Sequence, residues 1–332
     1  MIRVAVVGAT GYSGGELCVL LHRHARVELV CVQGSAGRKP TAFELLHPQL
    51  RGVAGPPCGP YSEDDLVGSG AEVVFLATPN ETSAEVAPRL VARGLRVIDL
   101  SGAFRLADPA EHERWYGFAR GTSDAFYSVP ELLDDAGRER LRSAPLIASP
   151  GCYATSVILA LAPLVSLLHP TEAVIADCKS GVSGAGKRAE LAYSFSELAG
   201  NFKAYGTTGH RHEPEIRHAV GMHGAFVLVP HLLPVMRGIL STVYVPLARD
   251  VEHAELAACF ERYVHARHVL VHPHGELPQL TDVVGTTRCD LGFQVLPGRR
   301  LLVVSALDNL LKGAASQAVQ QLDLAYGLPD LL

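Results

Sequence analysis

The sequence has no uninterrupted apolar run of about 18 residues, the length at which a membrane-spanning helix becomes a candidate. It also has no basic excess, since 29 Lys and Arg stand against 34 Asp and Glu, a formal net charge of −5. Proteins that bind nucleic acid through its phosphates usually carry a basic surplus or stripe. The apolar run at 4–7 is too short for a secretory signal and leads directly into glycine. We therefore expect no membrane span, no nucleic-acid partner and no secretion.

The cysteines lack the patterns of a disulfide framework or a zinc ribbon. There are seven of them, an odd number, and none stands in a CxxC pair. Paired histidines at 210 and 212 and at 272 and 274 come without a third ligand at a supporting spacing. We therefore predict no metal and a reducing, cytoplasmic setting. Whether one thiol does chemistry stays open at this point.

The chain is long enough for two domains, because 332 residues compare with roughly 150 residues per domain. In its first part, apolar runs alternate with helix-like segments. The strand-like runs lie at 3–7, 27–32, 73–77 and 97–100, and the helix-like segments at 16–22 and 83–93. This alternation predicts the α/β class, a doubly wound parallel sheet (Rossmann-like), over residues 1–150.

The pattern changes near residue 150. A turn and a helix at 153–168 are followed by strand-like runs with few long helices between them. Those runs lie at 174–179, 225–229, 239–245, 294–296 and 301–307. They predict an α+β domain over 151–308 with a mostly antiparallel or mixed sheet. A last amphipathic helix at 309–326, in the segment 309–332, is expected to return to the first domain.

A glycine-rich turn lies between the first predicted strand and the first predicted helix. Gly8, Gly11 and Gly14 form GxxGxxG, which differs from the usual GxGxxG. Glycines there let the backbone approach a pyrophosphate at a helix N-terminus, whereas the alternative is an ordinary βα turn. The context favours a dinucleotide. The predicted cofactor contacts are Gly8, Thr10, Gly11, Tyr12, Ser13 and Gly14.

The second predicted strand ends without the acidic residue that an NAD-specific site usually offers to the ribose. Gln33 stands there, and Ser35, Arg38 and Lys39 follow. These three residues could neutralise a 2′-phosphate, which favours NADP. The alternative is a solvated basic loop.

Cys152 follows a Pro-Gly turn at the start of a predicted helix. Unpaired amides and the helix dipole there favour thiolate over thiol. The alternative, a buried structural cysteine, is the usual fate of a thiol and the default for the other six. A cysteine nucleophile also needs a base within reach, and His210 and His212 stand with Glu215 in HRHEPE.

Two further segments carry positive charge. Gly181, Gly186 and Lys187 match most of a P-loop, but Arg188 replaces its Ser or Thr, so we do not expect nucleotide hydrolysis. Lys187 and nearby amides could hold a smaller anion or line the cofactor site. Arg105 follows the predicted strand at 97–100, where ligands collect in open α/β sheets, although it could be a surface cation.

Together these residues resemble the N-acetyl-gamma-glutamyl-phosphate reductase family of arginine biosynthesis, which is related to the aspartate-semialdehyde dehydrogenases. The matching blocks run through nearly the whole chain: GATGYSGGEL, DLSGAFRL, SPGCYAT, SGVSGAGK, HRHEPEI, PHLLPVMRG and DNLLKGAASQA. The resemblance implies NADPH-dependent reduction of N-acetyl-L-glutamyl 5-phosphate to the 5-semialdehyde and phosphate through a cysteine thioester. Residues 1–150 would bind NADP, and 151–308 would supply catalysis, substrate binding and oligomerisation.

The resemblance also implies residue roles. Cys152 matches the nucleophile and His210 the acid/base, while His212 and Glu215 would orient that histidine or bind substrate. Further predicted contacts are Ser101, Arg105 and Ser149 for the substrate and Gly184 and Asn309 for the cofactor. Tyr205 has no assigned role.

Two other readings of the chain remain. One is a relative that reduces carrier-protein-bound aminoadipyl phosphate in lysine biosynthesis, and the other is a silent NADP-binding regulator. The family leads us to expect a homodimer or homotetramer that acts on a small acyl phosphate.

Overall fold

The computed structural model describes residues 1–121, 124–187 and 190–330, so Arg188 and the last two residues of the predicted C-terminal segment lie outside the described residues. The chain divides into two compact units. The first contains Met1–Pro150 together with Ala314–Leu332, and the second contains Gly151–Gly313. The chain therefore passes from the first unit to the second one residue before Cys152.

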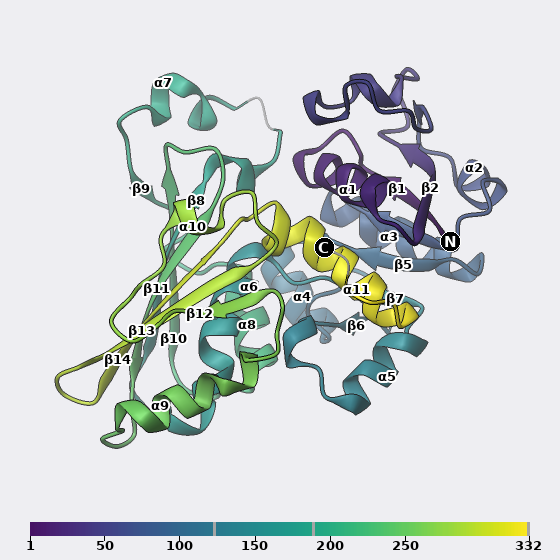
Figure 1. The fold of residues 1–332 in the computed structure, drawn as a ribbon. Coiled ribbons are helices and arrows are strands. Elements are labelled where there is room, and N and C mark those ends of the chain that lie inside the picture. The colour runs from purple at the N-terminus through teal and green to yellow at the C-terminus, as the bar shows by residue number, and fades with distance from the viewer. Residues whose placement is uncertain (122–123, 188–189, 331–332) are drawn as a thin grey trace. The chain divides into compact units, whose positions relative to one another are not determined.

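The first unit contains a seven-stranded sheet in which every strand pair is parallel (Figure 1). The strand order is β3-β2-β1-β4-β5-β7-β6. The strands are β1 (Ile2–Val7), β2 (Val27–Gln33), β3 (Cys58–Gly59), β4 (Val73–Leu76), β5 (Arg96–Asp99), β6 (Phe126–Tyr127) and β7 (Leu146–Ala148). Its helices are α1 (Tyr12–Arg23), α2 (Glu63–Gly68), α3 (Asn80–Ala92), α4 (Pro109–Tyr116), α5 (Asp135–Ser143) and α11 (Ser316–Tyr326).

Alternate residues of β1 enter two separate hydrophobic cores, one on each face of this sheet. Val4 and Val6 pack into a core with side chains of α1, α5 and α11. Ala5 and Val7 pack into the other, with side chains of α2 and α3. Because both faces are covered, the strand is apolar without alternation, which is typical of parallel sheets. The predicted doubly wound domain is confirmed.

The end of the chain differs from the single helix predicted from residue 309. A π-helical turn at Leu311–Ala315 comes first, and the α-helix α11 begins at Ser316 (yellow in Figure 1). Gly313 lies inside the π-helical turn. Five residues from Ala315 to Ala325 are buried in the core that β1 shares with α1.

The second unit contains a mixed seven-stranded sheet in the order β12-β13-β14-β11-β8-β10-β9. The β8/β10 and β12/β13 pairs are parallel, and the other pairs are antiparallel. The strands are β8 (Val174–Gly181), β9 (Lys203–Ala204), β10 (Phe226–Leu233), β11 (Ile239–Pro246), β12 (Val269–Val271), β13 (Cys289–Leu296) and β14 (Arg300–Leu307). Its helices are α6 (Cys152–Leu161), α7 (Phe195–Leu198), α8 (His212–Val220), α9 (His253–Phe260) and α10 (Leu280–Val283). The predicted α+β architecture with a mixed sheet is confirmed.

Helix α6 packs against this sheet and is shorter than predicted. The Ser156 hydroxyl hydrogen-bonds to Ser241 on β11 at 2.8 Å and to Ser305 on β14 at 2.9 Å. The α-helix ends at Leu161 and continues as a 3₁₀ helix over Ala162–Leu167. Pro163 explains the change, because it has no N–H for an α-helical bond and its ring clashes with the preceding turn.

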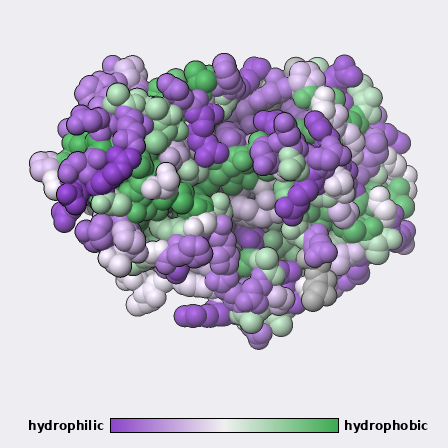
Figure 2. Space-filling view, turned by 90° about the horizontal axis from the view of Figure 1, so that it is seen from below, coloured by the Kyte–Doolittle hydropathy of each residue, from purple (hydrophilic) through white to green (hydrophobic). Residues whose placement is uncertain are grey.

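The other face of this sheet exposes apolar side chains. Ile175, Val227 and Tyr244 on β8, β10 and β11 are 41%, 41% and 44% exposed. Polar groups stand among them, since Asp177 forms an ion pair with Lys179 and lies 3.0 Å from Nδ1 of His231. Figure 2, seen from below, shows that surface hydrophobic residues gather in patches between hydrophilic ones. In the described part of the chain, no helix combines the length and the apolar character needed to span a membrane.

Candidate functional site

The turn that carries Cys152 is fixed by a buried carboxylate. Cys152 is the first residue of α6, and Gly151 is its N-cap. The Gly151 N–H donates to Oε1 of Glu215 at 2.8 Å, and the Glu215 side chain comes from α8. Glu215 is only 1% exposed. All seven cysteines fall within the described residues, and none of them forms a disulfide.

His210 lies just before α8, with its ring held by the backbone. The His212 N–H donates to Nδ1 of His210 at 3.2 Å. The two imidazole rings lie 4.7 Å apart, centroid to centroid, and the Tyr153 ring lies 5.7 Å from that of His210. Burial, and then the charge of Arg211, lowers the pKa of His210 to about 4. The imidazole is therefore neutral near pH 7.

Two tyrosines complete the surroundings of Cys152, although sequence reasoning assigned a role to neither. The Tyr153 and Tyr205 hydroxyls lie 3.0 Å apart. Burial raises the pKa of Tyr153, and burial also raises the pKa of Tyr205 to about 12. Charge on Cys152 is a smaller cause of the raised pKa in both cases. Tyr153 directly follows Cys152 in the chain, whereas no sequence signal joins Tyr205 to Tyr153 across 52 residues.

Gly313 leaves room for Cys152. A Cβ atom added at Gly313 would lie 2.8 Å from Cβ and 3.3 Å from Cα of Cys152, and 3.2 Å from Cδ1 of Leu307. Separations under 3.0 Å essentially never occur for a real Cβ atom. The glycine of the predicted DNLLKGAA block is therefore a close steric neighbour of the thiol-bearing residue.

Asn309 connects two loops of the second unit. Its side-chain oxygen accepts from the Gly238 N–H at 2.7 Å, and its side-chain nitrogen donates to the Ser183 hydroxyl at 3.0 Å. Gly184 lies next to this amide, with 3.8 Å between an added Cβ and the Asn309 nitrogen. Asn309, Ser183 and Gly184 thus form one cluster, while the predicted cofactor contacts of Gly184 and Asn309 stay predictions.

The glycine-rich turn of the first unit fits a bound pyrophosphate. Gly8 has φ +86°, and a Cβ atom there would lie 2.3 Å from the Ala77 carbonyl oxygen. A Cβ atom at Gly14 would lie 2.2 Å from the Gly8 oxygen, so α1 starts in direct contact with the end of β1. No side chain caps α1, whose N-cap is Gly11. Backbone amides at a helix N-terminus of this kind are suited to phosphate oxygens. Thr10, Tyr12 and Ser13 lie in the same segment.

The end of β2 carries no negative charge. Gln33 is buried, and its side-chain amide both donates to the Ser62 carbonyl at 3.0 Å and accepts from the Ser62 N–H at 3.1 Å. Arg38 donates to the Thr41 hydroxyl at 3.1 Å. Ser35 and Lys39 are exposed beside it. The basic residues predicted for a 2′-phosphate therefore lie together after β2.

The predicted substrate residues of the first unit form a network at the ends of β5 and β7. Ser101 donates from its hydroxyl to Asp99 at 2.7 Å, and burial raises the pKa of Asp99. Arg105 donates from Nε to the Ser149 carbonyl at 2.9 Å and from Nη2 to the Leu100 carbonyl at 2.7 Å. The Ser149 hydroxyl donates to Gln321 at 2.8 Å. Arg105 therefore braces the backbone that leads to Cys152.

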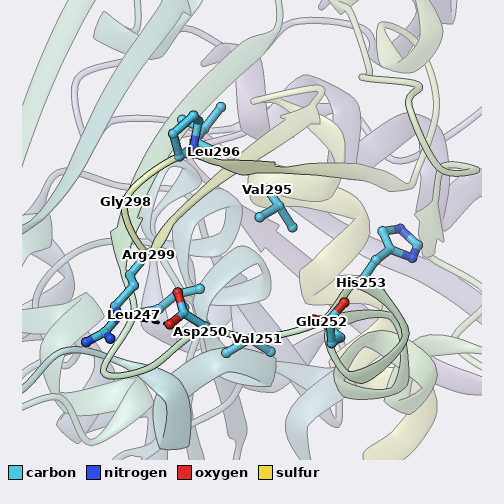
Figure 3. Close-up of a pocket in the computed structure, with 10 residues that line it drawn as sticks. Leu247, Asp250, Val251, Glu252, His253, Val295, Leu296, Gly298 and Arg299 are labelled. Atoms are coloured by element: carbon cyan, nitrogen blue, oxygen red, sulfur yellow. Dashed lines mark hydrogen bonds and ion pairs between the residues drawn. The ribbon is translucent and has the colours of Figure 1, made fainter.

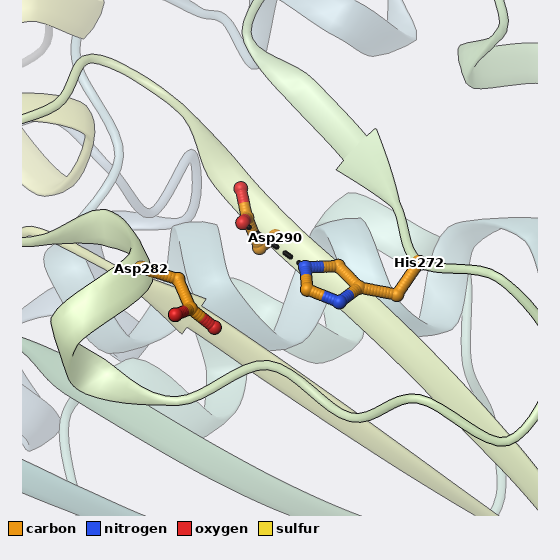
Figure 4. A group of neighbouring side chains, drawn as sticks. All are labelled: His272, Asp282 and Asp290. Carbon is orange, nitrogen blue, oxygen red and sulfur yellow. Dashed lines mark hydrogen bonds and ion pairs between the residues drawn. The ribbon is translucent and has the colours of Figure 1, made fainter.

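Two other features of the second unit lie apart from these residues in the chain. A cavity of about 440 Å³ is formed by the β13–β14 turn and the start of α9, where Arg299 pairs with Asp250 at 3.3 Å (Figure 3). Its lining contains no residue predicted for the site. His272, Asp282 and Asp290 lie close enough to share an ion (Figure 4). However, Arg288 already binds Asp290 at 2.7 Å, and Asp282 caps α10.

Comparison with known proteins covers both units. Residues 3–140 match the family described as semialdehyde dehydrogenase, NAD binding domain, and residues 152–309 match semialdehyde dehydrogenase, dimerisation domain. Among solved structures, aspartate semialdehyde dehydrogenase II from Vibrio cholerae has a TM-score of 0.73 at 19% identity, over 98% of this chain and 99% of that one. The Candida albicans enzyme, solved with NADP, has a TM-score of 0.75 at 14% identity, over 98% of each chain. These two likenesses show the fold.

Sequence relatives are more similar. The N-acetyl-gamma-glutamyl-phosphate reductase of Laribacter hongkongensis is 43% identical over 99% of this chain and 97% of its own. The protein of the same name from Pelotomaculum thermopropionicum is 42% identical over 99% of this chain and 96% of its own. This identity extends through both units, and it confirms the resemblance seen in the sequence blocks. The chain belongs to the N-acetyl-gamma-glutamyl-phosphate reductase family.

Proposed function

We propose that this protein reduces N-acetyl-L-glutamyl 5-phosphate to N-acetyl-L-glutamate 5-semialdehyde and phosphate with NADPH, as a step of arginine biosynthesis. The observation that carries the proposal is the position of Cys152, at the first residue of α6, with the preceding amide held by Glu215 and with His210 in the same unit. Helix N-termini stabilise negative charge, so this position suits a thiolate nucleophile. The names of the sequence relatives support the substrate.

NADPH, when bound, supplies the hydride. The glycine-rich turn between β1 and α1 would hold its pyrophosphate, and Ser35, Arg38 and Lys39 would hold its 2′-phosphate. The amide of Gln33 leaves that position uncharged, so no carboxylate repels the phosphate. Gly184 and Asn309 would contact the cofactor at its other end.

The Cys152 thiolate would attack the acyl carbon and expel phosphate, which leaves a thioester. Reduction of that thioester gives a thiohemiacetal, and its collapse releases the aldehyde and regenerates the thiolate. A thiolate is suited to both steps, because it is a strong nucleophile and a good leaving group. The amides at the start of α6 would stabilise the oxyanion.

The remaining site residues would bind and orient the substrate. Arg105, Ser101 and Ser149 follow strand ends in the first unit, where ligands of open α/β sheets bind. His212 would orient His210 through its backbone. Glu215 would fix the Cys152 turn through Gly151, and its near-complete burial supports this role over direct substrate contact.

A homodimer or homotetramer is the proposed assembly. The family that matches residues 152–309 is described as a dimerisation domain, which supports pairing of copies. The open face of the second sheet also offers apolar residues such as Ile175, Val227 and Tyr244. Apolar patches of this kind mark contact sites in many proteins. A cytoplasmic, reducing setting is proposed because the nucleophile must remain a thiol.

The test is the reverse reaction. N-acetylglutamate semialdehyde, phosphate and NADP are mixed with the protein, and NADPH absorbance is followed, with Cys152→Ala as the control. Phosphate-dependent NADPH formation that disappears in the variant supports the proposal. Absence of any phosphate-dependent signal refutes the assignment, and unchanged activity in Cys152→Ala refutes the thioester route. Turnover only with a carrier-bound aminoadipyl semialdehyde would assign the lysine-pathway reaction instead.

A further inference from the structure

We propose that His47 is a positioning residue for the dinucleotide, because its Nε2–H holds the Ala9 carbonyl and so orients the glycine-rich turn for the pyrophosphate. Nε2 and the carbonyl oxygen lie 2.7 Å apart, and His47 is buried. Sequence reasoning assigned no role to this histidine. The inference rests on the proposed function, specifically on the proposed place of the pyrophosphate at this turn, and it requires no contact between His47 and the cofactor.

The chain between β2 and β3 fixes the backbone of His47. Pro48 follows it, and a residue before proline favours an extended conformation, which His47 has at φ −142° and ψ 148°. The His47 carbonyl accepts the Leu50 N–H at 3.0 Å, at the start of a 3₁₀ turn. Phe43 and Leu50 are buried in the same core as Leu17 of α1. The segment is therefore anchored on both sides of the imidazole.

Gly15 of α1 gives the imidazole access to the turn. A Cβ atom added at Gly15 would lie 2.7 Å from Cε1 and Nε2 of His47 and 2.8 Å from its Nδ1. Since three ring atoms lie at nearly the same distance, the ring packs with its face against Gly15. The backbone there is helical, a conformation that alanine adopts more readily than glycine. Close packing against His47, and not the backbone conformation, therefore requires glycine at this position.

The hydrogen bond from His47 fixes the peptide between Ala9 and Thr10. Nε2 carries the proton, because a carbonyl oxygen can only accept. The Ala9 N–H donates to the Gln33 carbonyl at 3.1 Å, so both polar groups of Ala9 are held. In a planar trans peptide the N–H points away from the C=O, and the Thr10 N–H is therefore directed away from the imidazole.

A fixed peptide is useful at an anion site. An amide that is already oriented loses little conformational freedom when a phosphate oxygen binds, which is the general benefit of preorganisation. Without the bond from His47, the 9–10 peptide could populate other orientations, and only the competent fraction would bind the cofactor. His47 thus acts on the affinity for the dinucleotide and not on the chemical step.

Direct binding of the cofactor tests the proposal. The Kd for NADP is measured by titration calorimetry without substrate, and His47→Ala should raise it about 2- to 10-fold, the equivalent of one typical hydrogen bond. The Kd for NAD should rise by the same factor, because both dinucleotides carry the pyrophosphate. His47→Gln, whose side-chain N–H can still donate, should recover part of the loss. The kcat at saturating NADP in the reverse assay should stay close to that of the wild type.

The control is His22→Ala. His22 is an exposed histidine of α1, and its ring lies 6.0 Å from that of Phe43, so it borders the same segment without a bond to the turn. Both dissociation constants should be unchanged in this variant. A change as large as that in His47→Ala would refute a specific role of His47.

A double variant tests the contact with Gly15. In Gly15→Ala the new Cβ displaces the imidazole from the Ala9 carbonyl, so the Kd for NADP should rise about as much as in His47→Ala. When both changes are combined, the methyl group occupies space that the ring has left, and the Kd should rise no further than in His47→Ala alone. Multiplied effects of the two changes would refute the contact argument.

Other outcomes separate this inference from the proposed function. An unchanged Kd in His47→Ala, a rise for NADP alone, equal losses in His47→Ala and His47→Gln, or a fall in kcat as large as the rise in Kd would each overturn the inference. No binding of NADP by the wild type would refute the proposed cofactor site together with this inference. NADP binding that responds to His47 as expected, without turnover in the reverse assay, would refute only the proposed reaction.

Discussion

Replacing Gly313 by alanine should displace Cys152 while leaving the fold intact. The new Cβ would lie 2.8 Å from Cβ of Cys152, whereas ordinary van der Waals contact begins at 3.4 Å. The two residues must therefore separate by about 0.6 Å or more, the difference between these two distances. Leu307, 3.2 Å away on another side, restricts the direction of escape. Overpacking of this kind costs about 1–3 kcal/mol of stability.

The effect on activity should be larger than the effect on stability. A misplacement of about 1 Å can cost about 100-fold in rate, so we expect Gly313→Ala to lower kcat/KM by roughly 10- to 100-fold. The assay is steady-state NADPH formation in the reverse reaction, together with thermal unfolding. The control is Gly68→Ala, because Gly68 lies in α2 and an added Cβ there meets nothing within 4 Å. Wild-type kcat/KM in Gly313→Ala, or equal losses in both variants, would refute the steric argument.

Three further predictions concern other groups. Glu215→Ala leaves the buried Gly151 N–H without its acceptor and should lower the free energy of unfolding by about 1–3 kcal/mol in a denaturant titration. Glu215→Gln, whose amide oxygen can still accept, should lose less stability. Equal losses in the two variants would contradict the assigned contact. Arg38→Ala with Lys39→Ala should raise KM for NADP at least about tenfold, the equivalent of 1.4 kcal/mol, and barely change KM for NAD; equal changes would refute the 2′-phosphate assignment. Burial, and then the charge of Arg120, lowers the pKa of the buried His112 from 6.5 to about 4. Between these two pH values the unfolded state binds more protons than the folded state. The free energy of unfolding should therefore fall by on the order of 3 kcal/mol as the pH is lowered from 6.5 towards 4. His112→Phe should flatten this part of the curve of unfolding free energy against pH, and an unchanged slope would refute it.

Local signals in the sequence predicted the elements whose cause is local. The glycines at 8, 11 and 14 indicated the strand–turn–helix of the first unit, and the Pro-Gly pair indicated that Cys152 begins a helix. The predicted helix to 168 was too long, because the apolar pattern outweighed Pro163, where the α-helical bonding ends. The π-helical turn before α11 had no such signal, because Leu311–Ala315 reads as ordinary helix.

Contacts between distant residues could not be read in the same way. Glu215 reaches Gly151 across 64 residues, and Tyr205 reaches Tyr153 across 52. Each contact depends on which parts of the fold pack together, such as α8 against α6 for Glu215 and Gly151, and no periodicity encodes that choice. The sequence therefore pointed to Cys152 and His210 as residue types, whereas the contact of the Gly151 amide with Glu215 could be seen only in three dimensions.

The contribution of α11 to the first core has a consequence for how the chain is made. The core formed by residues of β1 and α1 is complete only when side chains of α11, such as Val319 and Leu322, have packed against them. During synthesis, the whole second unit emerges before α11 does. The ribosome-bound chain therefore carries an uncovered apolar surface along α1 and β1 for most of its translation. Domains usually fold in order from the N-terminus, whereas here the second unit is fully synthesised before the first unit can complete its core.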